Sequence, residues 1–239
     1  MGACGVQRAG IDGRTSLQPG EGRTIRLQAV LTEASRETTT FHWELPNGER
    51  RQGEQLEYTP PAALNRFDLR LRATNADGDE LGWARTSVSV PPAALARLGQ
   101  DTIRIEGEDF TGQGGGEVRF YEPFNASGKA FSHWNRSAGH WLEWEFDVTK
   151  EGNYLVFARY TTAVKAVSRS LTIDGVSPTP TYDKISFPGT GGWSVSADNW
   201  DFKQLGPPLC LTAGKHRIRM TNLDSVVNFD YLVLTRVEP

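Results

Sequence analysis

Cysteine is scarce in this sequence, and long apolar runs are absent. Of 239 residues only Cys4 and Cys210 are cysteines, and because they lie near opposite ends of the chain we expect no internal disulfide. Small residues precede Cys4, as at a bacterial lipoprotein cleavage site, but no apolar run stands before it, so we interpret it as the start of a truncated chain. No window of about 18 apolar residues occurs, and the sequence therefore predicts no membrane span.

Several classes of function are disfavoured by missing patterns. The formal net charge is -3 and the 26 Lys and Arg residues are scattered, whereas a nucleic-acid-binding surface needs a concentrated basic stripe. The four histidines form neither a His-Glu-x-x-His motif nor a Cys/His zinc spacing, and no Gly-x-Ser-x-Gly elbow occurs. The sequence therefore predicts neither nucleic-acid binding nor a zinc or serine hydrolase.

Alternating apolar and polar residues are abundant, and no segment has a convincing helical period. The chain contains 25 glycines and 13 prolines, and turn dipeptides such as Asn47-Gly48 separate the alternating runs. Pro91 and Pro92 end one such run, because proline cannot donate a hydrogen bond to a strand ladder. We therefore predict an all-β protein with two domains, joined by a linker at residues 91–101.

The first domain is predicted to be an immunoglobulin-like β-sandwich over residues 17–90. Half-buried strands are indicated at 24–31, 39–45 and 67–74. Trp43 is expected in the core between the sheets. The segments Phe-His-Trp-Glu-Leu-Pro-Asn-Gly, Leu-Glu-Tyr-Thr-Pro-Pro and Leu-Arg-Ala-Thr-Asn-Ala-Asp-Gly resemble a polycystic-kidney-disease-type (PKD) or related immunoglobulin-like domain. The resemblance implies a spacer, as such domains usually are in bacterial polysaccharide-degrading enzymes.

The second domain is predicted to span residues 102–239. In the strand expected at 141–148, Leu142, Trp144, Phe146 and Val148 share one face, which should lie in the core. Further strands are indicated at 154–160, 170–173, 216–220 and 229–234. A second β-sandwich closes such a set of strands naturally.

Two acidic strand motifs bracket this domain, at 105–110 and 228–232. Alternate side chains of a strand share a face, so Glu106 and Glu108 would point the same way about 7 Å apart. If the closing strand lies beside the opening one, Asp230 joins them, and three oxygen donors converge where Ca2+ could neutralise them. The alternatives are a solvated strand face and an inverting glycosidase pair. The glycosidase is disfavoured because a general acid lies beside a substrate cleft, whereas these glutamates adjoin a linker.

Residues 102–236 resemble carbohydrate-binding modules of families 6 and 35 through five motifs in the same order. The motifs are Ile105–Phe110, Gly139–Phe146, Glu151–Tyr160, Thr212–Arg219 and Asn228–Leu232. The resemblance implies a jelly-roll β-sandwich, a structural Ca2+ and a sugar site built from loops at one edge. It assigns Glu106, Glu108 and Asp230 to the structural metal, with a main-chain carbonyl near Lys129 as a fourth donor.

The same resemblance assigns Trp134, Trp193 and Asn228 to sugar binding. A tryptophan ring offers a flat apolar face to the C–H groups of a pyranose, and the asparagine amide hydrogen-bonds to hydroxyls. The alternatives are a buried loop anchor for Trp193, a sheet cap for Trp134 and a turn residue for Asn228. Some family 35 members bind uronic acids through a second Ca2+. The loop residues that could supply this second site are Asp198, Asn199 and Asp201, and the alternative is that their side chains are solvated.

We therefore expect a non-catalytic carbohydrate-binding module that brings an attached polysaccharide-active catalytic domain to its glycan. The larger protein, its secretion and its bacterial origin are implied by the resemblance alone. The alternative is a structural module that has lost its sugar site and packs against a neighbouring domain. Exposure of the two site tryptophans distinguishes the hypotheses, because a binding module should present both rings to solvent.

Overall fold

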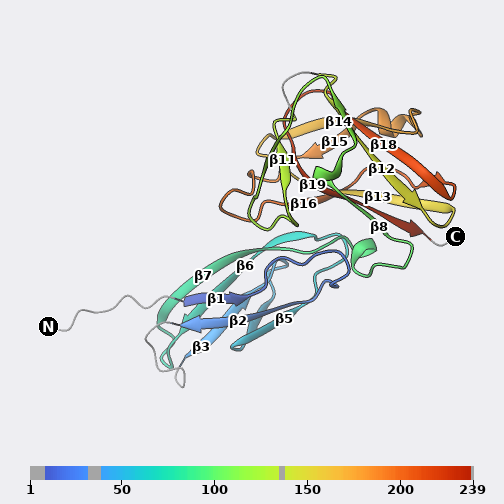
Figure 1. Cartoon of the computed structure of the whole chain (residues 1–239). Coiled ribbons are helices and arrows are strands. Elements are labelled where there is room, and N and C mark those ends of the chain that lie inside the picture. The colour runs from blue at the N-terminus through green and yellow to red at the C-terminus, as the bar shows by residue number, and fades with distance from the viewer. Residues whose placement is uncertain (1–8, 32–38, 135–137, 238–239) are drawn as a thin grey trace. The chain divides into compact units, whose positions relative to one another are not determined.

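The computed structural model describes residues 9–31, 39–134 and 138–237, and Cys4 lies outside this range (Figure 1). The described residues are mainly β-strands, so the predicted all-β class is confirmed. The chain divides into two compact units, Met1–Arg97 and Leu98–Pro239, called here the first and second units. No helix among the described residues is both long and apolar enough to cross a membrane.

The first unit is built from two antiparallel sheets. One sheet has the strand order β1-β2-β5 and the other β4-β3-β6-β7. The strands are β1 (Ala9–Gly13), β2 (Ile25–Leu31), β3 (Thr40–Glu44), β4 (Arg50–Gln52), β5 (Gln55–Tyr58), β6 (Arg66–Thr74) and β7 (Glu80–Ser89). Both sheets contribute buried apolar side chains to one core, as a β-sandwich requires.

The alternation of β6 shows why the sheet has two different faces. Phe67, Leu69 and Leu71 are buried, while the residues between them are exposed, as expected from a period of two. Trp43 of β3 is completely buried, and its indole N–H donates to the Gly53 carbonyl over 2.9 Å. The expected core position of Trp43 is therefore confirmed.

Part of the stretch predicted as a linker belongs to the first unit. A short 3-10 turn, η2 (Ala93–Leu95), places Leu95 in a fully buried position. The Gly20 amide donates to the Leu95 carbonyl over 2.9 Å, and the Gly22 amide donates to the Ala96 carbonyl over 2.8 Å. These main-chain bonds attach residues 92–96 to the first unit, so they do not form a free connector.

The second unit also consists of two antiparallel sheets. One holds β10-β11-β19-β13-β16, with β8 paired to β19 and β17 paired to β13; the other has the order β15-β14-β18-β12-β9. The strands are β8 (Ile103–Glu106), β9 (Gly112–Gly114), β10 (Arg119–Tyr121), β11 (Ala130–Ser132), β12 (Trp141–Val148), β13 (Gly152–Thr161), β14 (Ala166–Ile173), β15 (Ile185–Pro188), β16 (Asp201–Gln204), β17 (Leu209–Leu211), β18 (Gly214–Asn222) and β19 (Asn228–Val237). Two 3-10 turns, η3 (Gly107–Asp109) and η4 (Pro180–Asp183), complete the regular structure.

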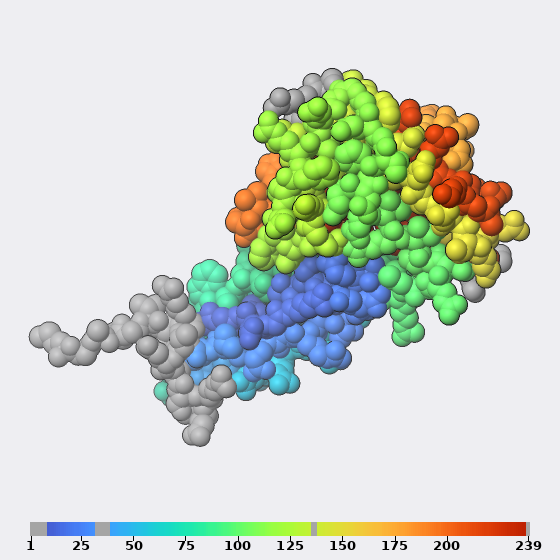
Figure 2. All heavy atoms as spheres, viewed as in Figure 1, coloured from blue at the N-terminus to red at the C-terminus, as the bar shows by residue number. Residues whose placement is uncertain are grey.

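The core of the second unit lies between its two sheets. The predicted inward set of β12, Leu142, Trp144, Phe146 and Val148, is buried. β19 is buried from Asn228 to Thr235, because it lies inside the larger sheet with strands paired on both sides. β8 and β19 are neighbours, so the opening and closing strands do lie side by side. The chain from β8 to β11, green in Figure 2, covers much of the face seen there.

Candidate functional site

A cavity of about 290 Å³ opens on the second unit at the edge formed by β10, β11 and the start of β19. Its lining residues are Tyr121, Ser132, His133, Trp193, Val195, Val226 and Asn228. Trp193 and Val195 belong to the loop between β15 and β16, which reaches over this edge. The structure therefore brings together Trp193 and Asn228, two of the three predicted sugar-binding residues.

A chain of hydrogen bonds fixes the cavity wall. The Asn228 side-chain amide donates to the Tyr121 hydroxyl over 2.6 Å, and this hydroxyl donates to the Trp193 carbonyl over 3.3 Å. Burial raises the pKa of Tyr121 to about 12, so its hydroxyl stays protonated at neutral pH and can donate. Asn228 is only 4% exposed, and its amide is held in one orientation by this contact.

Trp134 does not line the cavity, so its predicted role as the second sugar-facing ring is corrected. It is 0% exposed, and its indole N–H donates to the His140 carbonyl over 3.0 Å. The ring packs edge-on against Phe131 and Phe229 at centroid distances of 5.6 and 6.1 Å. Trp134 is buried because it completes an aromatic cluster in the core.

Tyr121 supplies the second ring of the cavity, and sequence reasoning missed it. It lies 107 residues from Asn228, and only the pairing of β10 with β11, and of β11 with β19, brings the two together. The sequence feature that could have indicated Tyr121 is the aromatic pair Phe120-Tyr121, which precedes a turn-rich stretch. This pair does not indicate which of the two rings faces the cavity.

The backbone around the cavity is unusual. Four described residues other than glycine have positive φ, and three of them are Asn125, His133 and Ser194. His133 lines the cavity, and Ser194 follows Trp193 directly. Such left-handed conformations cost free energy and persist where surrounding contacts hold them, as at ligand-binding loops. Here the Ser132 hydroxyl contacts the His133 Nδ1 atom at 2.8 Å.

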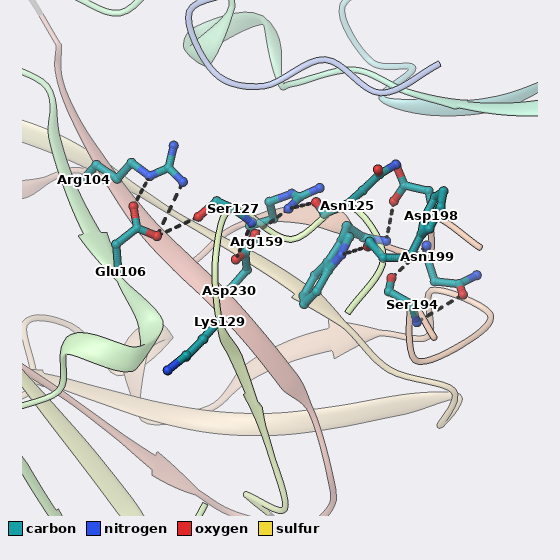
Figure 3. A network of polar contacts seen from close by, with 12 residues as sticks. Arg104, Glu106, Asn125, Ser127, Lys129, Arg159, Ser194, Asp198, Asn199 and Asp230 are labelled. Atoms are coloured by element: carbon teal, nitrogen blue, oxygen red, sulfur yellow. Dashed lines mark hydrogen bonds and ion pairs between the residues drawn. The ribbon is translucent and has the colours of Figure 1, made fainter. Parts of the chain in front are cut away.

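The three predicted metal ligands converge on residues 127–129, in the loop before β11. Figure 3 shows two of them, Glu106 and Asp230, beside Ser127. Ser127 donates its hydroxyl to Glu106 over 2.8 Å and its amide to Asp230 over 3.2 Å. The Lys129 amide donates to one oxygen of Glu108 over 3.1 Å. This loop is therefore held by carboxylates from β8, η3 and β19.

The charges around these acids are only partly balanced. Arg104 pairs with Glu106 at 2.6 Å, and the buried Arg159 guanidinium pairs with buried Asp230. The second oxygen of Glu108 is buried without a hydrogen-bond partner. Burial raises the pKa of Glu108, and the nearby charges of Glu106 and Asp109 raise it further.

The oxygen atoms in this region are of the kind that Ca2+ binds, but the acidic side chains are not arranged as a complete coordination shell. Carboxylate and carbonyl oxygens are the donors that Ca2+ prefers, and the unpartnered Glu108 oxygen leaves one of them unused. Among the described residues, however, no three His, Cys, Asp or Glu side chains are grouped closely enough to hold a metal ion. The acids therefore surround residues 127–129 without forming a finished coordination shell.

The loop before β11 also contacts the loop that carries Trp193. Figure 3 shows Asn125 between Arg159 and Asp198: its carbonyl accepts from Arg159 over 2.8 Å, and its side chain donates to Asp198 over 3.2 Å. The Phe124 amide donates to the Ser194 carbonyl over 2.8 Å. A continuous set of contacts therefore joins the acidic cluster to the cavity wall.

The oxygens considered for a second Ca2+ already serve the loop itself. One Asp198 oxygen accepts from the Trp200 amide at 3.1 Å, and Asp201 accepts from the Phe202 amide at 2.7 Å. The Asn199 side-chain oxygen accepts from the Ser194 amide at 3.3 Å. These contacts shape the loop, and they favour a structural role over a cation site.

Comparison with known proteins gives a family match for the second unit. The sequence model of the family described as Carbohydrate binding module (family 6) matches residues 106–236. A comparison with curated proteins gives no match.

Solved structures similar to this chain include three separate modules. A family 35 carbohydrate-binding module from Clostridium thermocellum is 21% identical, over 57% of this chain and 98% of its own, with a TM-score of 0.46. A family 35 module from Paenibacillus barcinonensis is 20% identical, over 56% and 99%, with a TM-score of 0.47. A β-1,3-glucan binding family 6 module from Bacillus halodurans is 16% identical, over 58% and 98%, with a TM-score of 0.42.

Proposed function

The chain belongs, through residues 106–236, to the family 6 carbohydrate-binding modules, and from this premise we propose that its second unit binds a polysaccharide at the cavity beside Trp193. The observation that carries the proposal is the meeting of Trp193, Tyr121 and Asn228 in one wall of that cavity. The rings offer apolar faces to a pyranose, while the amide and hydroxyl groups hydrogen-bond to sugar hydroxyls. At about 290 Å³ the cavity is at the small end for ligand sites, which suits a short stretch of sugar units.

We propose that binding is non-catalytic and serves an attached catalytic domain. A glycosidase needs two carboxylates beside the scissile bond, and no Asp or Glu is among the described residues that line this cavity. Glu106 and Glu108 instead contact the loop before β11. Holding a catalytic domain near its polymer raises the effective concentration of substrate, to about the millimolar range for short flexible linkers. Such a protein would act outside the cell, as the family resemblance implies.

Trp193→Ala should remove most of the binding. Loss of a stacked ring costs about 1–2 kcal/mol, so we expect binding to weaken about tenfold or more. The measurement is affinity electrophoresis in gels that contain xylan, β-1,3-glucan, β-mannan or polygalacturonate. Phe120→Ala is the matched control, because Phe120 is 48% exposed on the same unit and does not line the cavity.

Retention of the wild type by one polymer, lost in Trp193→Ala and kept in Phe120→Ala, would support the proposal. If no polymer retains the wild type, the structural module that packs against a neighbouring domain becomes the better account. If reducing ends accumulate when the purified chain is incubated with a polymer, the non-catalytic assignment is wrong.

We further propose a structural Ca2+ held by Glu106, Glu108 and Asp230, with a main-chain carbonyl near Lys129. The supporting observations are the unpartnered Glu108 oxygen and the raised pKa of this carboxyl, which is caused first by burial and then by the nearby negative charges of Glu106 and Asp109. A bound Ca2+ would offset these negative charges. Because the three acids also hold residues 127–129, the ion would stabilise the loop before β11 without touching sugar.

Glu108→Gln should therefore change stability in opposite directions with and without Ca2+. Without Ca2+, the Glu108 carboxyl has a higher pKa in the folded protein than in the unfolded chain. Its contribution to the free energy of unfolding is therefore full below pH about 4.5 and is lost as the pH rises through the folded-state pKa. At neutral pH the variant, which carries no charge at this position, should be at least as stable as the wild type. With Ca2+ at about 100 times its dissociation constant, the wild type should gain about 2.7 kcal/mol and the variant much less. Thermal unfolding in Ca2+ and in chelator measures both effects.

Glu145→Gln is the control for this experiment, because Glu145 is an exposed carboxylate on β12. It should respond to Ca2+ as the wild type does. Equal Ca2+ responses in all three proteins would place any bound ion elsewhere, and no response in the wild type would remove the proposal.

A further inference from the structure

The outer face of the four-stranded sheet in the first unit has an exposed aromatic ring. One face of β4-β3-β6-β7 packs in the core, and the other bears Trp83, which is 69% exposed. Among the described residues no other tryptophan is strongly exposed. A hollow of about 640 Å³ lies on this face beside Trp83.

The pairing of the strands arranges arginines around Trp83. Arg72 of β6 lies opposite Trp83 of β7, and Arg70 lies opposite Arg85. On β3, Glu44 lies opposite Arg70 on one side and Arg50 on the other. Neighbouring strands are about 4.8 Å apart, and alternate residues about 7 Å apart, so these side chains form a grid on one face.

This grid is positively charged on a chain whose formal net charge is -3. Four arginines line the hollow against two glutamates. Arg72 pairs with Glu80 at 3.0 Å, and Arg85 pairs with Asp68. Within the described part of the chain, Arg50 and Arg70 have no ion pair with a carboxylate, and both are exposed. Two guanidinium groups are thus available to an anionic ligand.

We propose that this face of the first unit binds an anionic polysaccharide, with a sugar ring on Trp83 and acidic groups on Arg50 and Arg70. A guanidinium presents a planar fork that matches a carboxylate or a sulfate, and an indole ring suits the apolar face of a sugar. Glu44, between the two arginines, accepts hydrogen bonds from hydroxyl groups. A polymer whose acidic groups are separated by neutral, hydroxyl-bearing stretches matches the order of Arg50, Glu44 and Arg70 across the strands. The closely spaced phosphates of a nucleic acid would instead be repelled by Glu44 and Glu80.

This site is independent of the cavity beside Trp193, since it lies on the other unit. If both sites bind one polymer, the second contact becomes intramolecular and the overall affinity rises without any new interface. The first unit would then be a second binding module, beyond the spacer role that its resemblance implies.

The test uses the full chain with Trp193→Ala, so that the cavity of the second unit contributes little. Affinity electrophoresis with polygalacturonate presents carboxylates, dextran sulfate presents sulfates, and neutral dextran presents neither. We expect retention by one or both acidic polymers, weakening at high salt because exposed charges are screened. Adding Trp83→Ala should weaken this retention about tenfold, and adding Arg70→Gln about fivefold.

Arg26→Gln, added to the same background, is the matched control. Arg26 is an exposed arginine of β2, on the other sheet, where it pairs with Glu57 at 2.9 Å. Equal retention of the Trp83→Ala, Arg70→Gln and Arg26→Gln proteins would overturn the proposal, as would equal retention by neutral dextran or tighter binding to a single-stranded oligonucleotide. If Trp83→Ala lowers the unfolding temperature, Arg70→Gln still tests the site.

Discussion

Replacing Arg159 by methionine should lower the free energy of unfolding of the second unit by about 3–5 kcal/mol, because it leaves Asp230 buried without its partner. The two side chains are 1% and 0% exposed, so water cannot replace the lost guanidinium. Burial already raises the pKa of Asp230, and Arg159 opposes that rise. Methionine keeps much of the length and apolar packing of arginine, so the loss reports mainly on the unpaired carboxylate.

Arg159 also connects parts of the site. Its guanidinium donates to the Asn125 carbonyl and lies 5.0 Å from the centre of the Trp200 ring. We therefore expect Arg159→Met to weaken polysaccharide binding as well, since Asn125 and Asp198 join the loop before β11 to the loop that carries Trp193.

Urea unfolding in chelator measures the stability loss, with Arg159→Met/Asp230→Leu as the decisive second variant. Removing both charges should restore much of the lost stability, because a buried pair contributes little net free energy compared with apolar groups of similar size. If Arg159→Met alone costs less than about 1 kcal/mol, or if the double variant is less stable than the single one, the pair does not act as argued.

Trp134→Ala should destabilise the second unit by about 3–5 kcal/mol, whereas Trp193→Ala should change stability by about 0.5 kcal/mol or less. Trp134 is fully buried, touches Phe131 and Phe229, and lies 4.6 Å from the Arg169 guanidinium carbon. Removing it creates a cavity and leaves the His140 carbonyl without its indole donor. Trp193 lies on a surface loop at a cavity edge, where no core depends on its ring.

The two tryptophans therefore form a matched pair that separates stability from binding. Chemical unfolding and affinity electrophoresis are measured on both variants, under conditions where each remains folded. The expected result is a large stability loss for Trp134→Ala and a large binding loss for Trp193→Ala. If Trp134→Ala kept its stability and lost binding, Trp134 would be a sugar-facing residue, contrary to its position in this structure.

Local patterns predicted most of the fold. A period of two in β6 and β12 set which side chains enter each core, since only one face of a half-buried strand can be apolar. The absence of a helical period predicted the all-β class. The position of Trp43 followed from the same alternation. These predictions succeeded because each depends on neighbours within one strand.

The candidate site was predicted less completely. Trp193 and Asn228 were identified by motif, and they line one cavity. Trp134 was assigned to that site because it lies where the resemblance places the second ring, yet a motif does not specify whether a ring points to solvent or to the core. Tyr121 was missed because its neighbour Asn228 is distant in sequence.

The sequence by itself determined many of the longer strands, the all-β class and the family of the second unit, because these depend on local alternation and on motif order. Only the tertiary structure decided which aromatic ring faces the cavity, that Arg159 neutralises Asp230, and that four arginines gather around Trp83. The physical reason is strand pairing: main-chain hydrogen bonds between β10, β11 and β19, and between β3, β6 and β7, place distant side chains on one surface.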